Sequence, residues 1–287
     1  MNIRPIFSLF GILLCSFSTV FLVPAFVGYI FNEINYLSFI LVFIGVMLLG
    51  LLMWLPNKNS IDALKISDGF IVTAMFWFVL GIVGAIPFIT YGISPVNAFF
   101  ESTSGITTTG ATVLVGLDDL PKSLLIYRQM LQWVGGMGLI ILVVAIMPTL
   151  GIGGGQLFKM EVPSFESSQR LTPRITQNAK ALWQIYLFLT ISCLLAYLIS
   201  GMGLFDALAH ALSTVAIGGF STHDASIGYF DSFAVEVVCI VFMLMSATSF
   251  SLHYAALYER KFLKYFYSCL LYTSPSPRDL STSRMPS

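Results

Sequence analysis

Six long apolar runs constrain this sequence more than any other feature. Each has about 20 or more residues and few charges, which is the length that an α-helix needs to cross the hydrocarbon core of a bilayer. Charged residues form only 10% of the chain, against about 25% in soluble domains. The sequence therefore predicts an all-α integral membrane protein. The expected spans are 6–31, 36–56, 69–91, 124–148, 179–200 and 233–257.

Charge predicts how these spans are oriented. With the N-terminus inside, the expected inner segments hold ten basic residues and the outer segments two, so the positive-inside rule favours both termini inside. The outer acidic residues would concentrate cations near an external mouth. The net charge is zero, and nothing suggests nucleic-acid binding. The inner basic residues are Arg4, Lys58, Lys65, Lys159, Arg170, Arg174, Lys180, Arg260, Lys261 and Lys264, the outer ones are Lys122 and Arg128, and the outer acids are Glu33, Asp118, Asp119, Asp224 and Asp231.

Two segments between the spans, 95–120 and 204–230, are too short and too mixed in polarity to cross a membrane. A shift of 109 residues aligns YGISPVNAFFESTSGITTTGATV with SGMGLFDALAHALSTVAIGGFST. The match predicts a repeated unit of span, short re-entrant helix, extended loop and span. The aligned pairs include Gly92 with Gly201, Asn97 with Asp206, Ala98 with Ala207, Ser104 with Ser213, Gly110 with Gly219 and Thr112 with Ser221.

The run TTTGAT in the first of these segments favours an ion filter. Irregular backbone at membrane depth is tolerated only where it is buried in protein or lines a water-filled path. Backbone carbonyls and threonine hydroxyls can replace water around a monovalent cation, and glycine permits the angles that aim successive carbonyls the same way. Asn97 and Asp206 are the expected N-caps of short helices that end near Ser104 and Ser213, and the negative end of each helix dipole points toward its loop. The alternative is that both loops are ordinary extracellular turns.

Glu101 is the one acid set among apolar neighbours in the first short helix, and His210 holds the equivalent place in the second. A charge at membrane depth usually has a partner or a role. We expect both residues to support the short helices, and Glu101 to add to cation attraction.

Four stretches of this sequence closely resemble the TrkH-type subunit of bacterial Trk potassium uptake systems, within the Trk/Ktr/HKT superfamily. They are ITTTGATVL, RQMLQWVGGMGLIILVVAIMP, LTPRITQNAKALWQIYL and FDALAHALSTVAIGGFSTHDASIGYFDS. The resemblance covers about residues 1–265 and implies two N-terminal helices followed by four span–pore–span repeats, whose loops form one potassium filter. It also implies potassium as the substrate, no cofactor, a bacterial inner-membrane location, homodimers, and gating by a TrkA-type cytoplasmic nucleotide-binding ring.

The resemblance assigns filter positions residue by residue. In plant relatives a serine at the place of Gly110 goes with sodium permeation, so the glycine here favours potassium. Only two of the four filter strands are present, and we therefore expect the N-terminal part of a transporter, truncated after the second repeat. The alternative is a membrane fragment or subunit that does not conduct. The implied potassium-binding positions are Thr108, Thr109, Gly110 and Ala111 in the first strand, and Ile217, Gly218, Gly219 and Phe220 in the second.

These patterns divide the chain into five parts. We expect two N-terminal transmembrane helices over 1–66, a first span–pore–span repeat over 67–150 and a cytoplasmic linker over 151–178. A second repeat is expected over 179–265. The remainder, 266–287, is rich in serine, proline and arginine, and is either foreign sequence or a disordered cytoplasmic tail.

The sequence shows no motif that would indicate an enzyme. The spans contain no G-x-S-x-G, no H-E-x-x-H and no paired aspartates. LGIGGGQL lacks the Gly-Lys-Ser/Thr ending of a phosphate loop and is expected to be an inner turn. The cysteines are expected to be small packing residues. Gly135, Gly136 and Gly138 fall in one span, where they favour close helix packing, with a hinge as the alternative.

Overall fold

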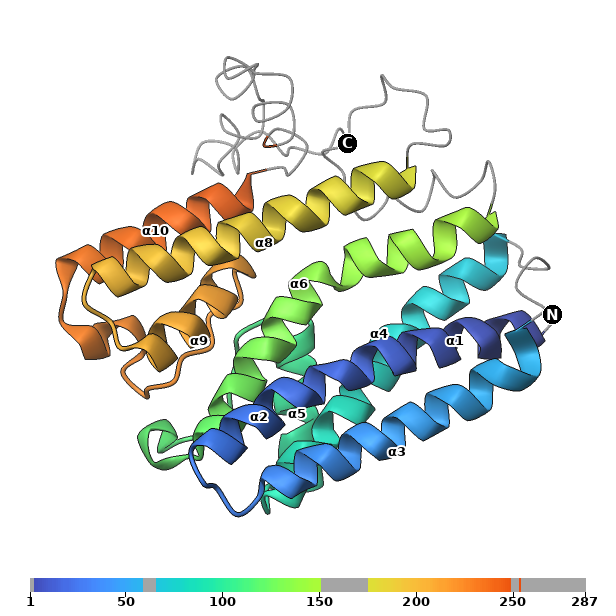
Figure 1. Cartoon of the computed structure of the whole chain (residues 1–287), viewed down its shortest axis with the longest axis horizontal. Coiled ribbons are helices and arrows are strands. Elements are labelled where there is room, and N and C mark those ends of the chain that lie inside the picture. Colours follow the sequence, from blue (N-terminus) through green and yellow to red (C-terminus); the bar gives the residue numbers. More distant parts are fainter. Residues whose placement is uncertain (1–2, 59–65, 151–174, 249–252, 254–287) are drawn as a thin grey trace, which may run out of the picture.

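The computed structural model describes residues 3–58, 66–150, 175–248 and 253, and its described elements are helices (Figure 1). The tail over 266–287 and most of the linker expected over 151–178 lie outside these residues, as do Arg170, Arg174 and the basic cluster 260–264. The helices are α1 (Ile3–Ser18), α2 (Leu22–Ile30), α3 (Tyr36–Trp54), α4 (Ile66–Thr90), α5 (Pro95–Ile106), α6 (Lys122–Leu150), α8 (Ile175–Ile199), α9 (Leu204–Val215) and α10 (Phe233–Ala247), with short 3-10 turns η1 (Thr19–Phe21), η3 (Leu117–Asp119) and η5 (Ser226–Phe230).

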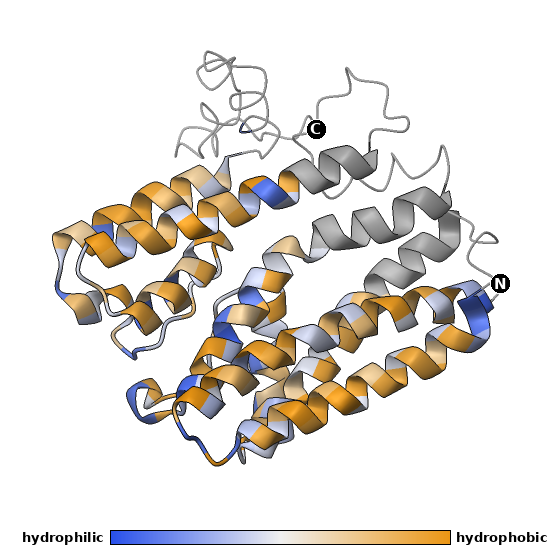
Figure 2. Ribbon diagram, in the orientation of Figure 1, coloured by the Kyte–Doolittle hydropathy of each residue, from blue (hydrophilic) through white to orange (hydrophobic). Residues whose placement is uncertain are grey.

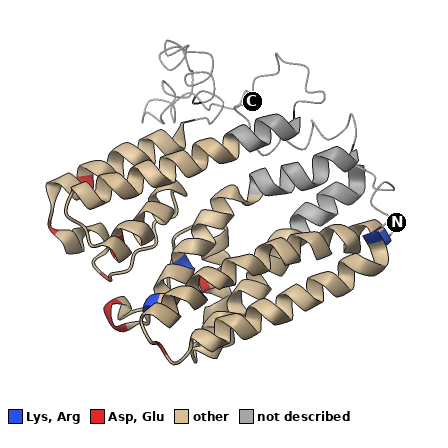
Figure 3. Ribbon diagram, in the orientation of Figure 1, with Lys and Arg blue, Asp and Glu red and all other residues tan. Residues whose placement is uncertain are grey.

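Helices are present at all six places where spans are expected. Apolar residues dominate them (Figure 2), and charged residues lie mainly at helix ends and in loops (Figure 3). The chain is thus an all-helical membrane protein with several apolar candidate spans. Within the described residues, three helical stretches are long and apolar enough to cross a membrane, namely Arg4–Ile30, Tyr36–Lys58 and Leu182–Ile199, and shorter apolar helices cover Met75–Thr90, Leu204–Val215 and Phe233–Ala247.

The two N-terminal helices, α1 and α3, lie against each other through small residues (Figure 1). A Cβ atom added to Gly11 would lie 2.6 Å from the carbonyl oxygen of Gly50, so a side chain there would force the helices apart. A Cβ atom on Gly50 would lie 2.7 Å from Cys15 Sγ. Cys15 therefore fills space beside a glycine, which is the packing role expected of it.

An aromatic cluster joins this N-terminal pair to α4 and α6. The ring of Tyr127 lies 5.3–5.7 Å from those of Phe21, Phe39 and Phe88, and all four side chains are buried. The Tyr127 hydroxyl donates to the carbonyl oxygen of Gly84 at 2.7 Å, so its polar atom is satisfied inside the core. α6 is thereby fixed against η1, α3 and α4.

The second group of helices, α8, α9 and α10, packs around its own apolar core, and α6 runs between this group and the first (Figure 1). Small residues let α6 pack closely against both groups of helices. A Cβ atom on Gly135 would lie 2.0 Å from the carbonyl oxygen of Ile106 at the end of α5, and one on Gly136 would lie 2.7 Å from Tyr186 Oη on α8. These contacts support the close-packing interpretation of the glycine run.

Candidate functional site

The loops that follow α5 and α9 begin with the same backbone conformation. We call residues 107–116 the first loop and residues 216–225 the second loop. Thr108 and Ile217 both have φ of 54°, and Gly110 and Gly219 have φ of 77° and 84°. Each pair is separated by the 109 residues of the sequence alignment. A positive φ is uncommon for Thr and rare for Ile, so both loops hold the same costly conformation at the same place.

The hydrogen bonds that turn the chain into each loop also correspond. The amide of Thr109 donates to the carbonyl of Ser104 at 2.9 Å, and the amide of Gly218 donates to the carbonyl of Ser213 at 2.9 Å. Such bonds satisfy two carbonyls that a helix end leaves without partners. The chain thus leaves α5 and α9 in the same way, although the two loops share few side chains.

The start of each short helix differs from the expected N-caps. α5 begins at Pro95, where the Ser94 side chain accepts from the amide of Asn97, and α9 begins after Gly203. Asn97 and Asp206 therefore lie in the first turn rather than before it. The physical reason in α5 is the proline, whose fixed φ favours the first helical position and moves the cap to the residue before it. The helices also continue two residues past the expected ends, to Ile106 and Val215.

The two loops meet at their glycines. A Cβ atom on Gly110 would lie 2.1 Å from the carbonyl oxygen of Gly218, so the first loop presses against the backbone of the second. Around Gly219 the space is open, with no atom within 4 Å of an added Cβ. Of the eight predicted filter residues, Gly218 and Phe220 are buried, Thr108 and Gly110 are half-buried, and Thr109, Ala111, Ile217 and Gly219 are exposed.

A buried carboxylate fastens the first loop. Glu101 on α5 is fully buried and accepts from Thr112 Oγ1 at 2.8 Å and from the amide of Val113 at 3.1 Å. It therefore ties α5 to residues 112 and 113 of the first loop. Ser104 adds a second tie, because its hydroxyl donates to the carbonyl of Ala111 at 2.5 Å.

Arg128 on α6 is the partner of Glu101, and it was missed as such in the sequence. Its Nη2 lies 2.8 Å from Glu101 Oε1, and both side chains are fully buried. Arg128 is therefore buried within α6 rather than exposed between helices, whereas Lys122 is the first residue of that helix. The sequence feature that could have predicted this pairing is the presence of two opposite charges at membrane depth. The ion pair also compensates the charge that Glu101 was expected to offer to cations.

The second loop is fastened by His210, by Gln132 and by the Asp206 carboxylate, which accepts from Thr222 Oγ1 at 2.8 Å. His210 Nε2 lies 2.9 Å from Ser221 Oγ, at the positions equivalent to Glu101 and Thr112. Gln132 on α6 adds a second tie, since its Oε1 accepts from Ser213 Oγ at 2.8 Å and from the amide of Phe220 at 3.1 Å. Each short helix thus bonds a hydroxyl in its own loop, but the chemistry differs.

The turn after the first loop is linked to the end of the second loop by acidic residues and a histidine. His223 Nδ1 contacts Asp118 Oδ1, and its Nε2 lies 3.4 Å from Asp206 Oδ1. The amide of Leu117 donates to Asp224 Oδ2 at 3.0 Å. The hydrogen bond from His223 is the main cause that lowers the pKa of the Asp118 carboxyl below its usual value. Among the residues that the structure describes, no group of three or more His, Cys, Asp or Glu side chains could hold a metal ion.

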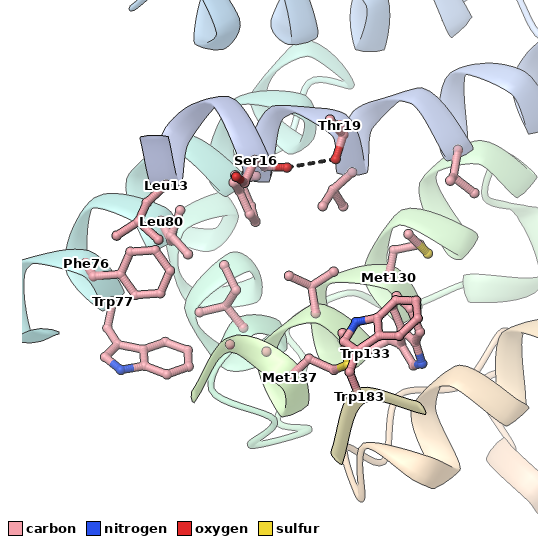
Figure 4. Close-up of a pocket in the computed structure, with 17 residues that line it drawn as sticks. Leu13, Ser16, Thr19, Phe76, Trp77, Leu80, Met130, Trp133, Met137 and Trp183 are labelled. Atoms are coloured by element: carbon pink, nitrogen blue, oxygen red, sulfur yellow. Dashed lines mark hydrogen bonds between the residues drawn. The ribbon is translucent and has the colours of Figure 1, made fainter. Parts of the chain in front are cut away.

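A separate cavity of about 270 Å³ lies between α1, α4, α6 and α8 (Figure 4). Apolar side chains line most of it, including Trp77, Trp133 and Trp183, and its polar residues are partly satisfied internally, as where Thr19 Oγ1 donates to the carbonyl of Ser16. Such walls suit an apolar group rather than an ion. The cavity is therefore not part of the candidate site.

Comparison with known proteins gives a consistent result. A family model described as TrkH, a cation transport protein, matches residues 36–272. A "Trk system potassium uptake protein TrkH" from Halomonas elongata is 51% identical over 270 residues, which are 93% of this chain and 56% of the relative. The protein of the same name from Escherichia coli K12 is 46% identical over 270 residues, with the same two shares.

One solved structure is also similar, the crystal structure of the potassium transporter TrkH from Vibrio parahaemolyticus. It matches with a TM-score of 0.78 and 48% sequence identity, over 90% of this chain and 53% of that chain. The chain therefore spans about half the length of the relatives that it matches.

Proposed function

Because the chain belongs to the TrkH family of cation transport proteins, whose members are transporters rather than enzymes, we propose that it supplies two strands of a potassium filter. The observation that carries the proposal is the contact between Gly110 and the carbonyl of Gly218, which joins two loops of matching backbone. Potassium is bound in such filters by rings of backbone carbonyls. The proposed potassium-binding residues are Thr108, Thr109, Gly110, Ala111, Ile217, Gly218, Gly219 and Phe220.

The two short helices support a cation site at these loops. α5 ends at Ile106 and α9 at Val215, directly before the proposed filter positions. The partial negative charge at a helix C-terminus favours a cation, and a glycine with positive φ lets neighbouring carbonyls face a common side. Neither feature requires a charged side chain in the filter itself.

The proposed filter has two walls in this chain, and a complete one needs oxygens from four sides. We propose that 67–150 and 179–265 are two span–pore–span repeats behind an N-terminal pair of helices over 1–66, joined by a linker over 151–178. The open space beside Gly219 is consistent with a further wall on that side. The chain would then be the N-terminal part of a transporter, with 266–287 as a foreign or disordered tail.

The test is uptake of potassium or rubidium in a strain without other uptake systems. A chimaera would join residues 1–265 to the part of the Halomonas elongata relative that this chain does not match. We expect the chimaera to support growth at low potassium and the 287-residue chain alone to take up nothing. A chimaera that reaches the membrane but carries no potassium would favour the alternative, a non-conducting fragment or subunit. Robust uptake by the short chain would contradict the two-wall argument.

The proposed partners are a second copy of the full-length subunit and a TrkA-type cytoplasmic ring. The resemblance motivates this proposal, together with the basic inner segments that contain Arg170, Arg174 and the cluster 260–264. Charge reversal at Arg170 and Arg174 in the chimaera should weaken capture by a TrkA ring. Unchanged capture would remove these segments from the proposed contact.

We propose a bacterial inner-membrane location with both termini in the cytoplasm. Even without Arg128, basic residues remain concentrated in the expected inner segments. Cysteines placed at Asp119 and Asp224 should react with an impermeant maleimide from outside only. Labelling of either position only in inverted vesicles would overturn this orientation.

A further inference from the structure

Arg128 contacts both loops at once, and on the basis of the proposed function we propose that it is a positioning residue for ion selectivity. In this proposal its guanidinium holds the outer ends of two neighbouring filter strands at a fixed separation. It does not contact the ion. Selectivity depends on how far apart the carbonyl walls stand, so a residue that sets their separation would affect which ion passes.

The guanidinium uses its donors on both sides. Nε donates to Glu101 Oε1 at 2.8 Å and Nη2 donates to Thr112 Oγ1 at 3.1 Å, and both acceptors belong to the fastening of the first loop. On the other side, Nη1 donates to the carbonyl of Ser221 in the second loop at 3.0 Å. The guanidinium carbon also lies 4.3 Å from the centre of the Phe220 ring. One rigid planar group therefore spans the boundary between the loops.

The positions that it joins are equivalent. Thr112 and Ser221 are separated by the 109 residues of the alignment, and each follows its filter glycine by two residues. The loops also touch where Gly110 faces the carbonyl of Gly218. The boundary is thus fixed at two levels, by backbone contact near the glycines and by Arg128 farther along both loops.

The second loop shows that the tie equivalent to Glu101 and Thr112 does not need an ion pair. There His210 bonds Ser221 directly, and the Asp206 carboxylate accepts from Thr222 Oγ1 in the same loop at 2.8 Å. A buried ion pair is in addition weak evidence for stability, because desolvation offsets much of the attraction. What Arg128 adds is its reach to the carbonyl of Ser221 in the other loop.

The experiment uses the chimaera described above and three changes. Arg128→Lys keeps the charge but replaces the planar fork by a single point of contact. A triple variant, Glu101→His with Thr112→Ser and Arg128→Val, copies the neutral tie of the second loop and removes the bridge. Lys122→Gln is the matched control, because it removes a cation from the same helix at a side chain that lies over Phe31 and Phe205 instead. The readouts are the ratio of rubidium to sodium uptake and the amount of protein in the membrane.

We expect Arg128→Lys and the triple variant to lower the rubidium-to-sodium ratio by about tenfold, the size expected when one hydrogen bond to a charged group is lost. Lys122→Gln should keep the parental ratio. Both Arg128 variants at the parental ratio, with normal membrane abundance, would overturn the inference and leave the proposed function intact. Absence of both variants from the membrane would assign Arg128 to folding, which also overturns it. A parent chimaera that reaches the membrane without rubidium uptake would overturn the proposed function as well.

Discussion

The first and second loops begin with the same backbone conformation, yet the side chains that hold them differ. The first loop is fastened by a buried ion pair, Glu101 with Arg128, and its glycine presses on the other loop. The second loop is fastened by His210 at the place of Glu101, by Gln132 and by the Asp206 carboxylate, and its glycine faces open space. A loop conformation can therefore be conserved within one chain while the contacts that stabilise it are replaced. The difference also identifies substitutions that should affect the two loops unequally.

The largest expected difference is between the two glycines. Gly110→Ala should destabilise the 287-residue chain by about 4 kcal/mol or more, because its Cβ would overlap the backbone of Gly218. Gly219→Ala meets no atom and should cost only about 1–2 kcal/mol, the price of the left-handed conformation. Thermal unfolding in detergent measures both.

The same two changes test the missing walls. If a further filter wall lies beside Gly219 in the chimaera, Gly219→Ala should lower the free energy of unfolding there by nearly as much as Gly110→Ala does. In uptake assays Gly110→Ser and Gly219→Ser should then both lower the preference for potassium, whereas Thr108→Ala should do less because its proposed contribution is a backbone oxygen. Parental transport by both serine variants would mean that these loops are not the filter.

The next largest effect compares the Glu101–Arg128 ion pair with the hydrogen bond between His210 and Ser221. Glu101→Gln should cost about 3 kcal/mol, since it leaves the fully buried Arg128 without its counter-charge. His210→Ala removes one neutral tie and a small volume, and should cost about 1–2 kcal/mol. Equal losses of unfolding free energy would show that the buried charge is compensated in another way.

A smaller effect should be confined to the second loop. Gln132→Leu leaves the Ser213 hydroxyl and the Phe220 amide without their acceptor, which should cost about 1–3 kcal/mol. Gln129→Leu is the matched control, because the buried amide of Gln129 has no partner in the described structure and its replacement should be neutral or stabilising. Hydrogen exchange should rise in residues 216–222 and not in 107–113 for Gln132→Leu alone.

The smallest effect concerns the link between the outer turns. The pKa of Asp118 is lowered by the hydrogen bond from His223, so this link contributes stability above the ordinary carboxyl pKa and loses it as pH falls through the lowered pKa. Hydrogen exchange at 117–119 and 223–226 should therefore increase below about pH 4. Asp118→Asn should raise exchange at neutral pH and remove this acid-dependent increase. An identical acid profile in that variant would assign the pH dependence to other groups.

Local patterns predicted much of the helical fold. Apolar runs located the six long helices, and the 109-residue alignment located α5 and α9 with the loops that follow them. Turn and cap details were less accurate, since Ser94 and Pro95, rather than Asn97, set the start of α5. The sequence also marked Glu101 as a charge in need of a partner, without identifying which residue supplies it.

By itself, then, the sequence determined the membrane-spanning character, the family and the two equivalent loop segments, because each is encoded by short-range spacing of apolar, glycine and capping residues. Only the tertiary structure decided that Arg128 pairs with Glu101 and reaches the carbonyl of Ser221, 93 residues away along the chain. Only it decided that Gly110, and not Gly219, meets another backbone. Such contacts depend on how helices distant in sequence pack together, and residue spacing along one helix carries no record of what lies across the boundary.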